Sequence, residues 1–316
     1  MTAPTPEFDK DEALLAELPV TVPVLDGPIE TAAGAPRRRA GADLWARFAR
    51  SKPAVASLVW LVVVLLIALL AGAIQTSPPF SGGPEALRPP GTPGHLLGTN
   101  HLGQDTWSQL VHGARVSLLV GFSVAAAATL IGVLVGALAG FFPGWIDTVL
   151  MRISEFFQTL PRLVLALIIV ALFGSSLLGM IIVVSILSWP QTARVVRGGV
   201  RTVRSAAFVD AARVAGMPAG VIIWREILPN VLSQIVVIAS LDVAMAILTE
   251  ASLSFFGLGD PNFVSWGGML FQAQAYLRSA WWLAVFPGLA IASVVLALNL
   301  VGDGLNDALN PRLKER

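Results

Sequence analysis

The feature that most limits the fold of this chain is an apolar stretch from Val116 to Ile146 without one charged side chain. A helix rises about 1.5 Å per residue and the hydrocarbon layer of a bilayer is about 30 Å thick, so this stretch can cross a membrane. The composition agrees, since 55% of the 316 residues are hydrophobic and 13% are charged. Soluble domains carry about a quarter of charged residues. We therefore predict an all-α membrane protein.

Further apolar runs predict a bundle of six transmembrane helices. The third of these is expected to begin in a polar lead-in and to bend near Pro161. The six predicted spans are Ala54–Ile74, Val116–Ile146, Asp147–Phe173, Leu177–Thr192, Val231–Phe256 and Trp281–Val301.

The start of the chain differs from the rest. Residues 1–40 contain six prolines, a composition typical of a disordered polar tail. In residues 41–53, Trp45 and Phe48 share one face of a predicted helix and the arginines lie toward the other, which predicts an amphipathic segment on the membrane surface. A positive flank that only sets the orientation of the first span explains these arginines equally well.

The positive residues predict the orientation. With the N-terminus inside, 18 of the 21 Lys and Arg residues fall in cytoplasmic segments, and only Arg88, Arg115 and Arg278 lie outside. Because cytoplasmic loops are enriched in Lys and Arg, we expect both termini in the cytoplasm. The predicted outer loops are then 76–113 and 257–280, and the polar loop 194–229 is cytoplasmic.

Several classes of site are excluded or not expected. The absence of cysteine excludes disulfides and thiolate sites. All three histidines lie in the loop 76–113, so we expect neither a metal site nor a Ser/His/carboxylate triad. None of the three lysines follows a glycine, so the chain lacks the Gly-Lys-Ser/Thr of a phosphate-binding loop. We expect no catalytic residue, no directly bound cofactor and no nucleic acid partner, and energy must come from a partner subunit or an ion gradient.

The polar stretch Asp210–Pro229 lies between two apolar runs, so it must stay in water. Ser205–Ala215 is rich in small residues and predicts a short helix that another protein can approach closely. Gly216 suits a left-handed cap, and Val221–Leu228 is expected to restart a helix that Pro229 closes. Such a unit, tied to a span at each end, would tilt both spans when pushed. The candidate contact residues are Asp210, Ala211, Ala212, Ala215, Gly216, Leu228 and Pro229.

Motifs in this region and elsewhere resemble a known family. Asp-Ala-Ala, three residues, Gly, and then Ile-Leu-Pro resembles the signature loop of ABC-importer permeases. Further motifs resemble the C-type subunit of the dipeptide/oligopeptide (nickel) importers; they are Leu97–Asp105, Gly113–Leu118, Glu250–Gly259, Ser265–Leu270 and Gly302–Leu305. The chain departs from the family pattern at Asp210 (usually Glu), at Glu226 (usually apolar), and at Asn100 and Gln104 (usually Asp and Arg).

The resemblance implies a type I ABC importer permease bundle over residues 54–312, located in the cell inner (plasma) membrane. It also implies a heterotetramer, in which this chain and a second permease subunit form the pathway for peptides and two ATP-binding subunits use ATP and Mg. An extracytoplasmic substrate-binding protein would deliver the cargo, and Asp210–Pro229 would dock in a cleft of the ATPase. No sequence feature selects peptides over nickel or another small solute, so both cargoes remain open.

Two acidic residues within the fifth span keep a different class open. Asp242 and Glu250 are ionisable groups inside a membrane segment, which is the pattern of an ion-coupled secondary transporter. Against this class, the six spans show no inverted repeat. The alternative is that each carboxyl is hydrogen-bonded to a neighbouring helix, and for Glu250 we favour this structural role.

The section Asp260–Arg278 is too short and too polar to span the membrane. We predict an outer-face helix that lines the pathway entrance or contacts the binding protein; a membrane-surface helix without substrate contact remains the alternative. The candidate pathway or outer-face residues are Asp242, Glu250, Ser254, Trp266 and Met269.

Overall fold

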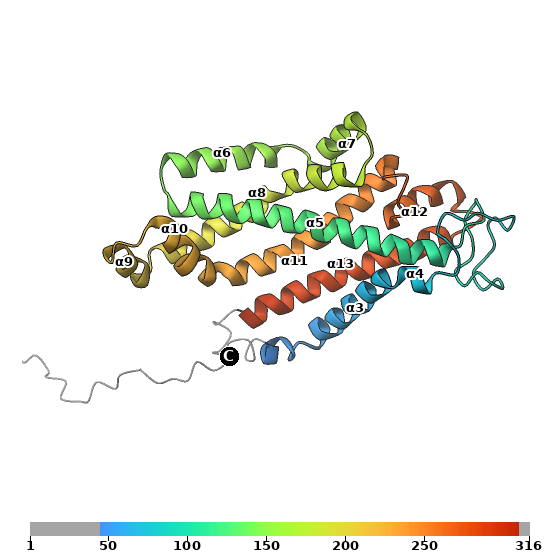
Figure 1. Cartoon of the computed structure of the whole chain (residues 1–316), viewed down its shortest axis with the longest axis horizontal. Coiled ribbons are helices and arrows are strands. Elements are labelled where there is room, and N and C mark those ends of the chain that lie inside the picture. The colour runs from blue at the N-terminus through green and yellow to red at the C-terminus, as the bar shows by residue number, and fades with distance from the viewer. Residues whose placement is uncertain (1–44, 310–316) are drawn as a thin grey trace, which may run out of the picture. The chain divides into compact units, whose positions relative to one another are not determined.

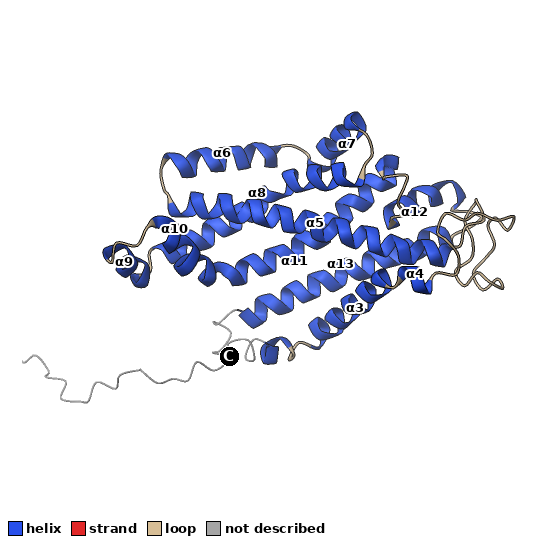
Figure 2. Ribbon diagram, viewed as in Figure 1, coloured by secondary structure: helices blue, strands red, loops and turns tan. Residues whose placement is uncertain are grey.

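The computed structural model describes residues 45–309, and within them all regular structure is helical (Figure 2). The predicted tail 1–40, the first part of the segment 41–53 and the last part of the domain 54–312 lie outside the described residues.

The fold class is confirmed, and the long helices follow the predicted spans except at the end of the second. That helix ends at Phe141, because the chain turns at Phe142–Gly144, and Trp145 and Ile146 already belong to the next helix. Between residues 45 and 309, five helices are long and apolar enough to cross a membrane, and a bent pair makes a sixth span if it is counted as one. The helices are α3 (Lys52–Leu69) with α4 (Ala71–Ile74), α5 (Thr106–Phe141), α6 (Trp145–Thr159), α7 (Arg162–Phe173), α8 (Leu177–Arg204), α11 (Leu228–Leu253) and α13 (Trp282–Leu309).

The bent pair is α6 and α7, which meet at 81°. The break falls at Leu160 and Pro161, where the backbone is extended. Proline has no N–H to donate and also disfavours a helical conformation in the residue before it. The predicted bend near Pro161 is confirmed.

Helix α5 lies at the centre of the bundle, in contact with α3, α8 and α11 (Figure 1). Its face toward α8 carries Gly132, Gly136 and Gly140. A Cβ at Gly132 would lie 2.6 Å from Cβ of Thr192, so only glycine permits this close approach. The two helices therefore pack backbone against backbone over several turns.

The bundle has two different ends (Figure 1). We call them the α9 end, after the short helix α9 (Ala207–Val214), and the α12 end, after α12 (Trp266–Ala273). At the α12 end lie the long loop between α4 and α5, the π-helix η2 (Ser254–Leu258) and the 3₁₀ turn η3 (Gln274–Tyr276).

One prediction at the α9 end is wrong. Pro229 does not close a separate helix, because α10 (Ala219–Val221) continues through the π-helix η1 (Ile222–Ile227) into α11. In the wider turn the N–H of Leu228 donates to the carbonyl of Ile223, five residues back. The proline, which lacks an N–H, is thereby accommodated without a break. In the same turn, Nδ2 of Asn230 donates to the carbonyl of Glu226 at 2.6 Å.

Candidate functional site

Helix α9 ends in a rigid turn. The N–H of Gly216 donates to the carbonyl of Arg213 at 3.0 Å, and that of Met217 donates to the carbonyl of Ala212 at 3.1 Å. These two bonds form a Schellman motif, which needs a left-handed residue after the helix. Gly216 supplies it with φ of +77°, so the predicted left-handed cap is confirmed. The turn fixes the angle between α9 and the chain that follows.

The inner face of α9 is anchored to the bundle. Val209 and Ala212 are buried in a cluster that includes Phe141 of α5, Ile222 and Ile227. The isoleucines of η1 thus pack beneath α9. The same cluster holds the start of α11, so α9 and α11 share one core at this end.

The polar side chains of α9 are paired within the helix itself. Nη1 of Arg213 donates to Oδ1 of Asp210 at 2.8 Å, one turn away. The guanidinium also lies 5.7 Å from the ring centroid of Phe141, a cation–π contact with α5. Asp210 sits in the first turn and Arg213 in the last, which suits the helix dipole.

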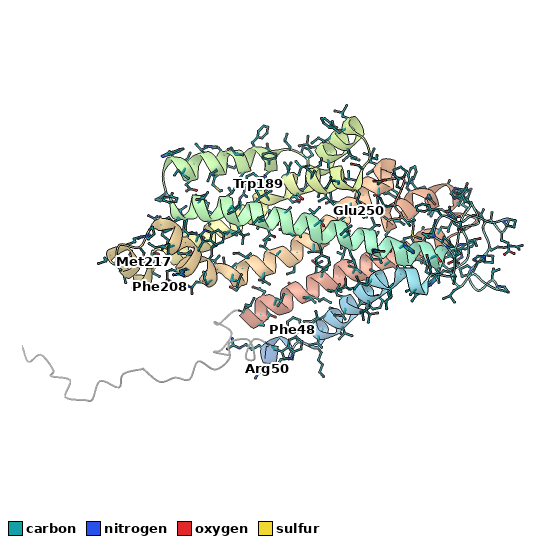
Figure 3. All side chains as sticks on the ribbon, viewed as in Figure 1. Phe48, Arg50, Trp189, Phe208, Met217 and Glu250 are labelled. Atoms are coloured by element: carbon teal, nitrogen blue, oxygen red, sulfur yellow. The ribbon has the colours of Figure 1, made fainter. Side chains whose placement is uncertain are left out.

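The outer face of α9 is exposed and partly apolar. Val214 is 89% exposed and Phe208 is 44% exposed, and Figure 3 places Phe208 with Met217 at the α9 end. Ala211, Ala215 and Gly216 are exposed as well. We did not identify Phe208 and Val214 from the sequence, although apolar residues in a short polar helix are a usable signal.

Two of the predicted contact residues need correction. Ala212 is only 8% exposed, and Leu228 is buried in the same cluster. Both side chains pack inside this chain, so neither can meet a partner directly. Pro229 is exposed at the first turn of α11. The exposed residues of α9 are therefore Ala207, Phe208, Asp210, Ala211, Arg213 and Val214, and Ala215 and Gly216 are exposed just after it.

A charged pair that the sequence did not reveal ties α6 to α8. The guanidinium of Arg197 donates twice to Asp147, with 2.7 Å between Nη2 and Oδ2. Both side chains are mostly buried, with 26% of Arg197 and 14% of Asp147 exposed. The two residues are fifty positions apart in the sequence. A bidentate pair of this kind holds the polar half of the bent span against α8.

At the α12 end, Glu250 is 1% exposed and fully engaged. Oγ of Ser254 donates to its Oε1 at 2.8 Å, and Oγ of Ser117 on α5 donates to its Oε2 at 3.1 Å. The backbone N–H of Trp266 points to Oγ of Ser117 at 3.4 Å. We call Glu250, Ser117, Ser254 and Trp266 the Glu250 cluster; Figure 3 shows Glu250 toward this end.

The Glu250 cluster fixes α12 in place. The indole N–H of Trp266 donates to the carbonyl of Leu110 at 3.0 Å, and Met269 is buried beside it. Ser254 and Met269 also line an open cavity of about 280 Å³, together with Asp260, Phe263 and other residues of this end. Of the predicted outer-face residues, these two therefore border open space, whereas Glu250 and Trp266 do not line it.

Asp242 lies midway along α11 and is also buried. Oγ1 of Thr192 on α8 donates to its Oδ2 at 2.7 Å. This bond joins α8 to α11 inside the bundle. Among residues 45–309, no three His, Asp or Glu side chains gather where they could hold a metal ion.

Comparisons with known proteins agree with this architecture. The family model for the binding-protein-dependent transport system inner membrane component matches residues 132–315. That for the N-terminal TM domain of oligopeptide transport permease C matches residues 40–90. The chain is 39% identical over 279 residues to the di/tripeptide transport system permease protein DppC of Pseudomonas aeruginosa, covering 86% of this chain and 92% of the relative.

Two further relatives cover most of both chains. The dipeptide transport system permease protein DppC of Escherichia coli is 41% identical over 280 residues, or 86% of this chain and 93% of the relative. The glutathione transport system permease protein GsiD of Pectobacterium atrosepticum is 37% identical over 308 residues, or 96% and 98%. The resemblance found in the motifs is confirmed, and the chain is a multi-pass membrane protein. It belongs to the binding-protein-dependent transport system inner membrane components, the family of ABC-importer permeases.

Proposed function

We propose that this chain forms half of the pathway of an ATP-driven importer for peptides. As a permease of this family it is not an enzyme, and it works with an ATPase and a binding protein. The relatives described above are named for di/tripeptides, dipeptides and glutathione, which supports peptides over nickel as the cargo.

The assembly that we propose contains a second permease subunit, two ATP-binding subunits and an extracytoplasmic binding protein. ATP and Mg act on the ATP-binding subunits. The α9 end faces the cytoplasm and the α12 end faces outward, because 18 of the 21 Lys and Arg residues then fall inside. In the cell inner membrane, both termini are cytoplasmic.

The observation that carries the coupling role is the pair of faces on α9. Its inner face is locked to α5 and α11, while Phe208 and Val214 remain uncovered at an end that we place in water. Exposed apolar side chains on a rigid, partly polar element mark a contact with another protein. We therefore assign the outer face of α9 to the ATP-binding subunit.

The carboxyls within α11 give no support to an ion-coupled carrier. Glu250 accepts hydrogen bonds from two serines and Asp242 accepts one from Thr192. Both carboxyls are buried. These bonds connect α11 to α5 and α8, which is a structural role.

A cross-linking experiment tests the coupling site. The natural chain has no cysteine, so Val214→Cys and Ala211→Cys each provide a unique thiol. In the assembled complex, both should cross-link to the ATP-binding subunit with a short bifunctional reagent. Leu277→Cys, exposed at the α12 end, is the matched control and should not.

The same preparation tests the assembly. Affinity purification of this chain should recover a second permease and two ATP-binding chains. If Val214→Cys reacts with water-soluble maleimide as fast in the complex as in the isolated subunit, the outer face of α9 is uncovered and the proposal fails.

A further inference from the structure

An apolar pocket lies where α3 begins and α13 ends. Its volume is about 320 Å³, and its lining includes no residue of α9 or of the Glu250 cluster. The residues that line it are Trp45, Phe48, Leu58, Val301, Leu305, Ala308 and Leu309. Its lining is almost purely hydrocarbon, so it does not suit a polar solute.

The pocket has a fixed floor and an open rim. Phe48 is buried against α13 at Gly304, where an added Cβ would lie 3.1 Å from its ring. Trp45 stacks on Phe48, with 5.9 Å between ring centroids, and is itself 58% exposed. A fixed aromatic floor under an exposed tryptophan is typical of the level of a bilayer where acyl chains meet headgroups.

Positive charge is concentrated in the short segment that carries the pocket residues Trp45 and Phe48. Arg47, Arg50 and Lys52 belong to the same short segment as Trp45 and Phe48, and no ion pair within residues 45–309 engages them. Figure 3 places Arg50 beside Phe48 at the start of the described chain.

The nearest acidic residues of α13 point elsewhere. Asp303 and Asp307 are each two residues from Leu305, or about 200° around a helix of 3.6 residues per turn. They therefore lie on the face of α13 opposite Leu305 and the pocket. The segment thus carries three positive charges within four residues of the pocket residue Phe48, and the acidic residues of α13 lie away from the pocket face of that helix.

We propose that this pocket binds an anionic phospholipid. One acyl chain fills the apolar space between α3 and α13, and the headgroup phosphate lies among Arg47, Arg50 and Lys52. Apolar burial supplies adhesion, and the basic residues select negative over zwitterionic headgroups. Lipid binding in this pocket requires neither the cargo nor the contact between α9 and the ATP-binding subunit.

Lipid titration monitored by native mass spectrometry tests this site on the full chain within its purified complex. Phosphatidylglycerol should bind with at least about tenfold higher affinity than phosphatidylcholine, given the contribution of each basic residue near a charged surface. The triple variant Arg47→Gln/Arg50→Gln/Lys52→Gln should lose this preference. Arg278→Gln, an exposed arginine at the α12 end, is the matched control and should retain it.

A second variant separates the pocket from its charges. Leu305→Trp fills the apolar space and should weaken binding of both lipids while leaving the three basic residues in place. Equal affinity for the two lipids in the natural chain would overturn the proposal, as would an unchanged preference in the triple variant. The double variant Leu305→Cys/Ala35→Cys would carry the only two cysteines of the chain, so a disulfide within the chain can join only these two positions. A disulfide forming in high yield would make the N-terminal segment the occupant and would also overturn it; its absence supports lipid.

Discussion

Replacing Gly216 by alanine tests whether α9 transmits force only while its turn is rigid. Gly216 has φ of +77°, and no atom lies within 4 Å of the position that an added Cβ would take. The alanine side chain therefore meets no neighbour, and the cost comes from the backbone alone. For an L-residue in the left-handed region that cost is about 1–2 kcal/mol.

A cost of this size lowers the population of the native turn by a factor of about 5 to 30. The turn can escape the strain only by giving up its two closing hydrogen bonds, to the carbonyls of Arg213 and Ala212. The buried cluster beneath α9 is unchanged, so the bundle should fold and assemble. We expect ATP hydrolysis to continue while peptide uptake per ATP falls several-fold.

The chain supplies a matched control in Gly220. An added Cβ there also has no neighbour within 4 Å, but Gly220 lies in α10 with a helical backbone. Alanine in a helix is favoured over glycine by about 1 kcal/mol, so Gly220→Ala should preserve coupling. Gly216→Asn should recover part of the loss, because asparagine tolerates the left-handed region.

The assay measures ATP hydrolysis and peptide uptake in the same proteoliposomes that contain the assembled complex. Thermal unfolding of each variant checks that the bundle is intact. Equal uptake per ATP for Gly216→Ala and Gly220→Ala would refute the reasoning, because the two substitutions differ chiefly in backbone conformation.

Three further predictions concern the α12 end. Glu250→Leu should lower the melting temperature, because two buried serine hydroxyls lose their acceptor at about 1–3 kcal/mol each. Glu250→Gln should lower the melting temperature less and should preserve ATP-driven uptake. A loss of uptake with unchanged stability would contradict a structural role. Burial raises the pKa of Asp105, but hydrogen bonds from Thr76, His95 and Ser108 outweigh it and hold the pKa below its ordinary 3.8. Its stabilising contribution is therefore complete above pH 3.8 and is lost as the pH falls through the lower folded value, so melting curves of Asp105→Asn should lose this acid-dependent step. Gly267→Ala would place a Cβ 2.6 Å from Cα of Ala251 and should destabilise by about 1–3 kcal/mol, whereas Gly288→Ala, with no neighbour within 4 Å, should not.

The spans were predictable because charge-free runs must match the membrane, but several helix ends lie outside those runs or short of them. Helix α5 begins at Thr106, ten residues before the predicted start, and Asp105 caps it by accepting the N–H of Ser108 at 2.9 Å. Helix α8 continues to Arg204, well past Thr192. Hydropathy marks where lipid ends, whereas caps and Gly–Pro turns mark where helices end. The signal in the sequence that marks the start of α5 is the N-cap residue Asp105.

Other features depend on partners far away in the sequence. The hydroxyl of Ser117 reaches Glu250 across 133 positions, and Arg197 reaches Asp147 across 50. No local pattern reveals such pairs. The same holds for the burial of Ala212, since a small residue on a short helix gives no sign of which face the bundle covers. The π-helical turn before Pro229 was likewise missed, because the proline pattern alone favours a break.

Between the two ends of the bundle, a hydrogen bond from Thr192 to Asp242 connects the helices that lead to each end. Helix α8 leads into α9, and α9 is followed by α10, η1 and α11. We therefore expect a displacement of α9 to act on both α8 and α11. The bond from Thr192 to Asp242 ties α8 to α11 midway, which opposes their sliding past each other. Farther along α11, Glu250 connects the same helix to α5 and to the start of α12. We therefore expect a displacement that starts at α9 to reach α12 through packed helices and buried hydrogen bonds, and we expect the carboxyls of Asp242 and Glu250 to act as connections along this path rather than as ion carriers.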